Sequence, residues 1–465
     1  MSSKKNLELS VPPKIKMNNM TSVEEQRVVT NNWEVNKTQL ELMQQKISQP
    51  PRLLSESAGR SSCCIFRVPQ SFINVNGRTY EPQIVSIGPY HHGTDNVKMI
   101  EEHKWRILGN LLKRTEEKGI NLEDYLKNIQ PLEMRARACY SESIPLTRDE
   151  FVEMLVLDGC FIIELFRKIG GVIPIEREDP LFSMAWIYPF LLRDLIRLEN
   201  QIPFFILKSL FEFTNGYDEP PTTPSLAKLV LTFFNFKLPR SKEVFEKFGN
   251  LEGKHLLDFL RSSYIFQDDE EPKTRRINLP THVKQCISKL RHAGIKLRPR
   301  QEETFLAIKF NNGFIEMPTI TIDDFMSAFL INCVAYEQCH VDCSKHMTTY
   351  ATLLDCLVNT HKDVEYLSDC NIIENYFGTH AEVAIFINNL GKEVMFDIDK
   401  CYLLGLFNKV NDYYKKSWHV HWASFKHTYF SSPWSFVSAF AALVLLALAV
   451  LQTLYSVLSY TNPPS

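Results

Sequence analysis

The sequence has little glycine and lacks the motifs of the common enzyme classes. Only 17 of its 465 residues are glycine, against 31 phenylalanines. Such a composition favours packed helices over a glycine-punctuated β-sandwich or barrel. The chain contains no Gly-x-Ser-x-Gly elbow, phosphate-binding loop, dinucleotide fingerprint or His-Glu-x-x-His motif. We therefore expect a mainly α fold with a small β element, and we assign no catalytic residue and no cofactor.

A strong net charge and an apolar leader are also missing. The formal net charge is −2, and basic runs such as Lys296 to Arg300 are short and lack interleaved aromatics. We therefore expect no nucleic-acid partner. The polar stretch from Met1 to Lys16 has no signal-peptide core. The eleven cysteines, an odd number without a repeating spacing, then indicate reduced thiols in the cytosol rather than a disulfide framework.

Composition divides the chain into four segments. Residues 1–60 are rich in Asn, Gln, Ser, Lys and Glu, which predicts a poorly ordered extension with one helix near Thr38 to Ile47. Residues 64–426 carry helical patterns and form the predicted body. Residues 433–460 form one apolar helix, and residues 461–465 form a short tail.

Helix signals are clearest in the first half of the body. Thr147 and Glu150 form a capping box that opens a helix running to about Lys168, before two glycines. Further helices are predicted over Leu181–Glu199 and Phe204–Phe213. The segment Leu198–Phe205 joins them, and its apolar side chains predict a place in the core.

One β signal stands out later in the chain. Phe305–Phe310 and Phe314–Ile320 flank Asn312-Gly313. An Asn-Gly pair between apolar runs favours a type I′ hairpin turn. By contrast, Ile65–Gly93 contains several proline and glycine steps and predicts an extended, looping segment.

Two groups of polar residues are candidates for acid–base chemistry. His91 and His92 follow a Gly-Pro step, and they fit a polar turn better than a general base because adjacent histidines point apart on a strand. Asp158 and Glu164 interrupt an apolar helix. They fit either a catalytic carboxylate pair or an internal polar network that fixes helix register, and we favour the network.

A third group contains metal-ligand residue types. Cys339, Cys343 and His346 would share one face of a continuous helix, and zinc prefers thiolate and imidazole ligands. The paired short Cys spacing of a zinc site is absent, however, and free cysteines also pack as small hydrophobic residues. These three remain weak candidates, and we expect no bound metal.

The strongest single feature is the apolar stretch from Trp434 to Leu454. It contains no charged side chain and reaches about 30 Å as a helix, the thickness of a bilayer core. We therefore expect a single-pass membrane helix with the lipid bilayer as a partner. The predicted anchor residues are Trp434, Phe436, Phe440, Leu443, Leu446, Leu451 and Tyr455.

Charge sets the expected orientation of this helix. Lys415, Lys416 and Lys426 precede it, and no Lys or Arg follows it. The positive-inside tendency then predicts a tail-anchored protein with a cytosolic body, in either the plasma membrane or the endoplasmic reticulum. The Asn-x-Thr sequons at Asn19 and Asn36 would carry glycan only in the reverse orientation.

Several ordered motifs resemble a known plant family. The segments that carry the resemblance are Arg67–Pro69, Tyr80–Gly93, Glu102–Arg106, Leu157–Leu165, Leu198–Phe205, Ala293–Ile295, Ile322–Asp324, Ala335–Cys339 and Tyr429–Phe430. They are similar, in sequence and order, to the DUF247 (UPF0481-like) domain of unknown function. The family is often more basic or polar just before the motif at Ala335, whereas Ala328–Val334 contains no arginine, so we transfer no ionic contact there.

The resemblance implies a plant source, a C-terminal membrane helix and no established reaction. Some family members are implicated in pollen-side self-recognition in grasses, which implies recognition rather than catalysis. We therefore expect a membrane-anchored interaction, recognition or signalling protein that has protein partners. The alternative is a membrane-bound hydrolase that uses the His91/His92 turn or the Asp158 and Glu164 carboxylates.

Overall fold

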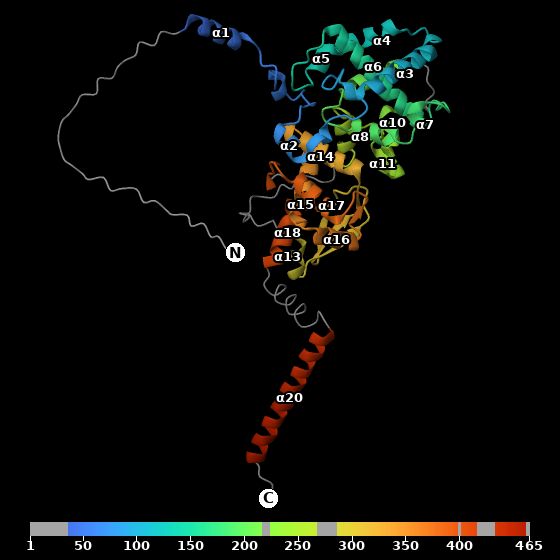
Figure 1. Ribbon diagram of the computed structural model, residues 1–465. Helices are drawn as coiled ribbons and strands as arrows, with labels where there is room; N and C mark the ends of the chain where they lie inside the picture. The colour runs from blue at the N-terminus through green and yellow to red at the C-terminus, as the bar shows by residue number, and fades with distance from the viewer. Residues whose placement is uncertain (1–35, 216–223, 267–285, 399–400, 416–432, 462–465) are drawn as a thin grey trace, which may run out of the picture. The chain divides into compact units, whose positions relative to one another are not determined.

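The computed structural model describes residues 36–215, 224–266, 286–398, 401–415 and 433–461 (Figure 1). The chain separates into two compact units, Met1–Pro50 and Pro51–Ser465. Most of the segment predicted to be poorly ordered, residues 1–35, lies outside the described residues. So do the two lysines nearest the apolar helix, Lys416 and Lys426, and the end of the short tail from residue 462.

The first unit contains one described helix, α1 (Lys37–Ser48). The Asn36 side chain begins it by accepting hydrogen bonds from the amides of Thr38 and Gln39. Asparagine is a preferred residue at this position because its oxygen satisfies amides that have no partner within the helix. The predicted helix near Thr38 to Ile47 is confirmed.

The second unit is mainly helical, and α6 (Arg148–Ile169) lies at the centre of its first half. The predicted capping box between Thr147 and Glu150 begins α6, and α6 packs against α3, α4, α9 and α10. The other helices of this half are α2 (Gln70–Asn76), α3 (Lys98–Glu116), α4 (Leu122–Ile129), α5 (Glu133–Arg137), α7 (Pro180–Ser183), α8 (Ile187–Asp194), α9 (Phe204–Asn215), α10 (Leu226–Phe234), α11 (Lys242–Lys247) and α12 (Leu256–Ser262).

The second half of this unit is built around α14 (Asp324–Cys339), which is buried along most of its length. Figure 1 shows α13, α15, α16 and α18 grouped together, at the opposite end of the helical body from α3, α4 and α6. The helices of this half are α13 (Ile287–His292), α15 (His346–Leu357), α16 (His361–Asp369), α17 (His380–Leu390) and α18 (Leu404–Lys415).

Two small sheets form the β element. In the first, β1 (Lys296–Arg300) pairs in parallel with β3 (Phe314–Pro318), which pairs antiparallel with β2 (Lys309–Asn311). In the second, β4 (Ile320–Ile322) runs parallel to β5 (Ile373–Asn375). Asn312 and Gly313 join β2 to β3 with φ angles of 48° and 81°. Both are positive, as a type I′ turn requires, so the predicted hairpin is confirmed.

Some local predictions were wrong. The single helix expected over Leu181–Glu199 is two helices, α7 and α8, because Asp179 caps a short helix that ends where Met184 becomes extended. The segment Ile65–Gly93 contains the short helix α2 as well as loops. The basic run Lys296–Arg300, for which no element was predicted, is strand β1 and pairs with β3.

The core prediction for Leu198–Phe205 is largely confirmed. Leu198, Ile202 and Phe204 are buried, and the Phe204 ring stacks on Phe259 with centroids 5.3 Å apart. Phe205 is only half-buried, and the Arg135 guanidinium lies over its ring. The segment therefore turns from the core to the surface within one residue.

The C-terminal apolar stretch forms α20 (Pro433–Thr461). Its residues Val437–Leu458 form a helix of 22 residues that is long and apolar enough to cross a membrane, and no part of its most apolar window is buried in the protein. Pro433 occupies the first turn, where its missing N–H has no consequence.

Candidate functional site

A buried ion pair connects α3 to α6. Lys104 Nζ lies 2.6 Å from Asp158 Oδ1, and both side chains are almost fully enclosed. The other carboxylate oxygen, Asp158 Oδ2, accepts a hydrogen bond of 2.7 Å from the amide of Gly88. Lys104 also donates to the carbonyl of Ser86 and to Glu101. Asp158 therefore holds the loop that precedes the two histidines against the helical core.

A second carboxylate, Glu199, holds the start and the end of the same looping segment. Its Oε1 accepts the Val68 amide at 2.8 Å, and its Oε2 accepts Arg67 Nη1 at 2.7 Å and contacts His91 Nε2 at 3.1 Å. Burial alone would raise the pKa of Glu199. The hydrogen bonds from His91 and Val68 and the charge of Arg67 outweigh burial, and this pKa lies below its ordinary value. Glu199 therefore stays ionised.

Residues near Glu199 in the sequence bind the middle of the same looping segment. Asp194 accepts the amides of Gln83, Ile84 and Val85 and pairs with Arg197 at 2.9 Å. Asn200 accepts the Ile87 amide at 2.7 Å. Backbone groups in an irregular buried segment need partners, and the stretch from 194 to 200 supplies them.

The structure does not bring the predicted carboxylates together. Asp158 and Glu164 are six residues apart on α6, which places them on different sides of the helix. Glu164 has its own partners, Arg114 at 2.6 Å and Arg167 at 3.1 Å. His91 reaches Glu199 instead of either carboxylate, and His92 is exposed. Each carboxylate therefore faces a cation, as the network interpretation expects.

The three candidate metal ligands are not on one helix. Cys339 is the last residue of α14, His346 is the first of α15, and Cys343 lies between the helices. The His346 ring stacks on Tyr402 with centroids 4.6 Å apart. Burial raises the pKa of Cys339 to about 12, which disfavours the thiolate that a metal requires. Within the described ranges, no three His, Cys, Asp or Glu side chains are placed to hold a metal ion.

One buried pair was missed by sequence reasoning. Arg261 Nε lies 2.7 Å from Glu337 Oε1, and both side chains are almost fully enclosed. Glu337 also accepts the amides of Met347 and Thr348 and so begins α15. The sequence feature that could have indicated this pair was Glu337 itself, a charged residue within the otherwise largely apolar motif Ala335–Cys339.

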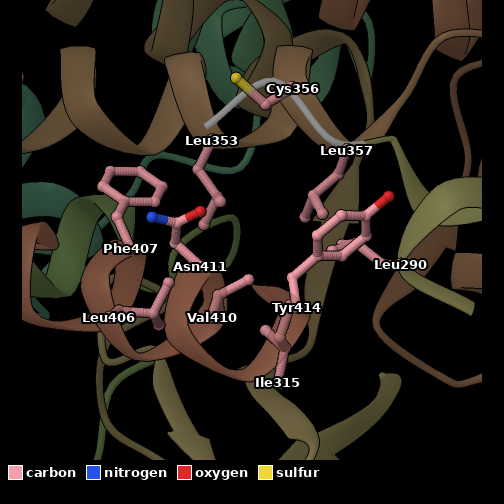
Figure 2. A pocket seen from close by; sticks show the side chains of 10 residues that line it. All are labelled: Leu290, Ile315, Leu353, Cys356, Leu357, Leu406, Phe407, Val410, Asn411 and Tyr414. Atoms are coloured by element: carbon pink, nitrogen blue, oxygen red, sulfur yellow. The ribbon is translucent and has the colours of Figure 1, made fainter. Parts of the chain in front are cut away.

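An apolar pocket lies in the second half of the body. Figure 2 shows Phe407, Val410, Asn411 and Tyr414 of α18 facing Leu353 and Leu357 of α15. The cavity measures about 30 Å³, far below the range of about 300–1,000 Å³ for pockets that hold drug-sized ligands. The pocket is therefore a small gap in the packing between α18 and α15, and it is too small for a ligand site.

The fold and its polar network define a class: a helical body with looping N-terminal segments held down by buried carboxylates, followed by a helix of membrane-spanning length. Comparison with known proteins identifies the family. The chain belongs to DUF247, described as "Plant protein of unknown function", whose sequence profile matches residues 65–448.

Two relatives come from Arabidopsis thaliana. UPF0481 protein At3g47200 is 37% identical over 436 residues, which cover 89% of this chain and 90% of that protein. Putative UPF0481 protein At3g02645 is 24% identical over 487 aligned positions, which cover 83% of this chain and 89% of that protein. No solved structure matches the chain.

Proposed function

We propose that this protein is a membrane-anchored recognition or signalling protein whose helical body lies in the cytosol. The observation that carries the proposal is the helix Val437–Leu458, a predominantly apolar stretch of 22 residues whose most apolar window is not buried inside the protein. At 1.5 Å per residue it measures about 33 Å, which suits a bilayer core of about 30 Å. Trp434 and Tyr460 lie near its two ends, where membrane-interface aromatics are enriched.

The charges on either side of the helix support a cytosolic body. Lys415, Lys416 and Lys426 precede α20, and the sequence after it contains no Lys or Arg. Positively charged residues next to a membrane helix are retained on the cytosolic side. This proposed topology is that of a tail-anchored protein.

The polar network supports recognition over catalysis. Asp158, Glu164 and Glu199 each accept hydrogen bonds from a cation and are largely enclosed. A general base needs a carboxylate or imidazole that faces the substrate, whereas these groups are engaged in holding loops and helices in place. We therefore give these carboxylates a structural role and assign binding of protein partners to the outer surface of the body.

Protease added to sealed microsomes that contain the full-length protein tests the orientation. We expect the body to be digested without detergent and the sequons at Asn19 and Asn36 to remain unmodified. A protected body with glycan at either asparagine would place it on the lumenal side and contradict the proposal.

Proximity labelling in plant cells tests the recognition role. The matched control carries a fluorescent protein in place of the body on the same segment, residues 433–465. We expect the full chain to label a reproducible set of proteins that the control leaves unlabelled. Identical sets for the two chains would show that the body recruits nothing and would reject a recognition role.

A further inference from the structure

A charged cavity lies between α3, α6 and the segment that follows α6. It measures about 250 Å³, slightly below the range of about 300–1,000 Å³ for pockets that hold drug-sized ligands. Ile107, Ile173 and Pro174 provide apolar walls, and Glu164 lies among the charged lining residues. The cavity is thus large enough for a small organic molecule. The carboxylates that hold the looping segment in place do not account for an open space at this position.

The ion pairs beside this cavity, which include two partly exposed arginines, contain more positive than negative charge. Glu164 is paired with two cations, Arg167 and Arg114. Asp179, also enclosed, is paired with two more, Lys168 at 2.5 Å and Arg106 at 2.7 Å. Four cations therefore surround two carboxylates, which leaves a surplus of two positive charges.

The cations paired with Glu164 and Asp179 differ in how exposed, and therefore how mobile, their side chains are. Arg167 and Lys168 are nearly enclosed, whereas the side chain of Arg114 is 41% exposed and lines the cavity. Arg167 alone neutralises Glu164, and it is further held by Thr214 at 2.6 Å. Arg114 can therefore turn toward a bound anion without leaving Glu164 unpaired.

The exposed charged residues at the mouth of the cavity do not cancel the surplus of positive charge. Lys113 and Glu176 are exposed residues that line the cavity, and their opposite charges cancel. A partly enclosed surplus of two positive charges is a favourable environment for a dianion, because burial weakens solvent screening. Glu164 at the wall excludes an anion from the deepest position and directs it toward Arg114 and Lys113.

We propose that this cavity binds a phosphate monoester dianion attached to a small organic group. An ammonium and a planar guanidinium can share the three terminal oxygens of one phosphate, and arginine matches phosphate geometry with two parallel hydrogen bonds. The apolar wall of Ile107, Ile173 and Pro174 accommodates the organic group. The phosphate can come from a soluble ester or from a lipid headgroup, since both present the same terminal group.

Calorimetric titration of the full-length protein in uncharged detergent micelles tests the site, with phenyl phosphate as the probe. At about pH 7.5 the probe is a dianion, since the second phosphate pKa is about 6. We expect saturable binding and at least about tenfold weaker binding of phenyl sulfate, the matched monoanion. Absence of saturable phenyl phosphate binding, or equal binding of phenyl sulfate, would overturn the proposal.

Two variants locate the binding. Lys113→Gln and Arg114→Gln should each weaken phenyl phosphate binding about tenfold. The control is Lys127→Gln, which removes an exposed lysine paired with Glu123 on α4 and should leave binding unchanged. The Lys113 variant keeps the test valid if Arg114→Gln fails to fold. Equal affinity of Lys113→Gln and Lys127→Gln would exclude this cavity as the site.

A competition arm separates the two sources of phosphate. Phosphatidylcholine vesicles containing phosphatidylinositol phosphate are added to the phenyl phosphate complex, and vesicles with unphosphorylated phosphatidylinositol are the control. Displacement by the phosphorylated lipid alone assigns the site to a headgroup, and no displacement by either assigns it to a soluble ester. Equal displacement by both vesicles would show that terminal phosphate is not recognised and would contradict the proposal.

Discussion

Lys104 Nζ and Asp158 Oδ1 lie 2.6 Å apart in the interior of the body, where neither side chain has appreciable exposure. Taking two charges out of water is costly, and the cost is recovered only when both remain paired and hydrogen-bonded. Asp158 meets this condition through the Gly88 amide, and Lys104 meets it through the Ser86 carbonyl. The pair therefore joins the looping segment, α3 and α6 in one arrangement.

Breaking this pair should destabilise the protein strongly. We expect Lys104→Met to lower the free energy of unfolding by about 3–5 kcal/mol, because it leaves the buried Asp158 carboxylate without its cation. Denaturant unfolding of the full-length protein in micelles measures this change. The control is Lys98→Met, an exposed lysine paired with Asp95, for which we expect a change below about 1 kcal/mol. Equal effects of the two variants would show that burial adds nothing to the Lys104 pair.

The two neighbouring phenylalanines at the start of α9 should differ. Phe204 is buried and stacks on Phe259, so Phe204→Ala should cost about 3–5 kcal/mol of unfolding free energy. Phe205 is half-buried under Arg135, and Phe205→Ala should cost clearly less. Thermal unfolding of both variants provides the comparison, and a larger loss for Phe205→Ala would reverse the assignment of the core face.

The hairpin turn should depend on the glycine at its second position. Gly313 has φ of 81°, and a Cβ there would lie 2.8 Å from the Tyr413 hydroxyl. Gly313→Ala should therefore lower stability by at least about 1–2 kcal/mol, the cost of a left-handed conformation for an L-residue. Gly59→Ala is the control, because Gly59 has no positive φ and no heavy atom within 4 Å of an added Cβ. Equal stability of the two variants in denaturant melts would refute the strained turn.

Stability should fall in mild acid through His255. Burial lowers the pKa of this histidine to about 4, whereas an unfolded histidine titrates near 6.5. The folded state then binds fewer protons between these values. The stabilisation is fully present above about pH 6.5 and is lost as the pH falls from there to about 4.

Unfolding free energies measured from about pH 7 to 5 test this titration. For each proton that the unfolded state binds and the folded state does not, the unfolding free energy rises by about 1.4 kcal/mol per pH unit. We expect His255→Gln to show a shallower slope than the unmodified chain, while His361→Gln, at an exposed position on α16, keeps the original slope. An unchanged slope in His255→Gln would mean that this histidine does not titrate as described.

The elements predicted from sequence were those with local signals. The capping box at Thr147, the Asn312-Gly313 turn and the apolar stretch in α20 each combine a short pattern with one physical cause, and the structure contains all three. Strand β1 lacked such a signal, since Lys296–Arg300 becomes a strand only through its pairing with β3. Patterns of one segment cannot reveal a parallel partner elsewhere in the chain.

The sequence indicated that the candidate site would contain paired, buried charges, but it did not indicate which residues pair. Asp158 and Glu164 stood out as charges inside an apolar segment, and Glu199 is a further charged residue next to the apolar Leu198. Burial of charge implies pairing. The partners of these three carboxylates, Lys104, Arg114 and Arg67, lie 54, 50 and 132 residues away, and only the fold brings them together. The same holds for Arg261 and Glu337, 76 residues apart.

Membrane fractionation of the full chain expressed in plant cells tests the central claim, that α20 anchors the protein. We expect the unmodified protein to resist alkaline extraction and to dissolve only in detergent, and we expect deletion of residues 433–465 to release the body into the soluble fraction. The double variant Leu446→Arg, Ala447→Arg should behave like the deletion, since each arginine at the helix centre costs about 2.5–3.5 kcal/mol of insertion free energy, while Leu446→Ala should remain in the membrane. An unmodified chain that alkali extracts, or a deleted chain that stays in the detergent-dependent fraction, would contradict the anchor.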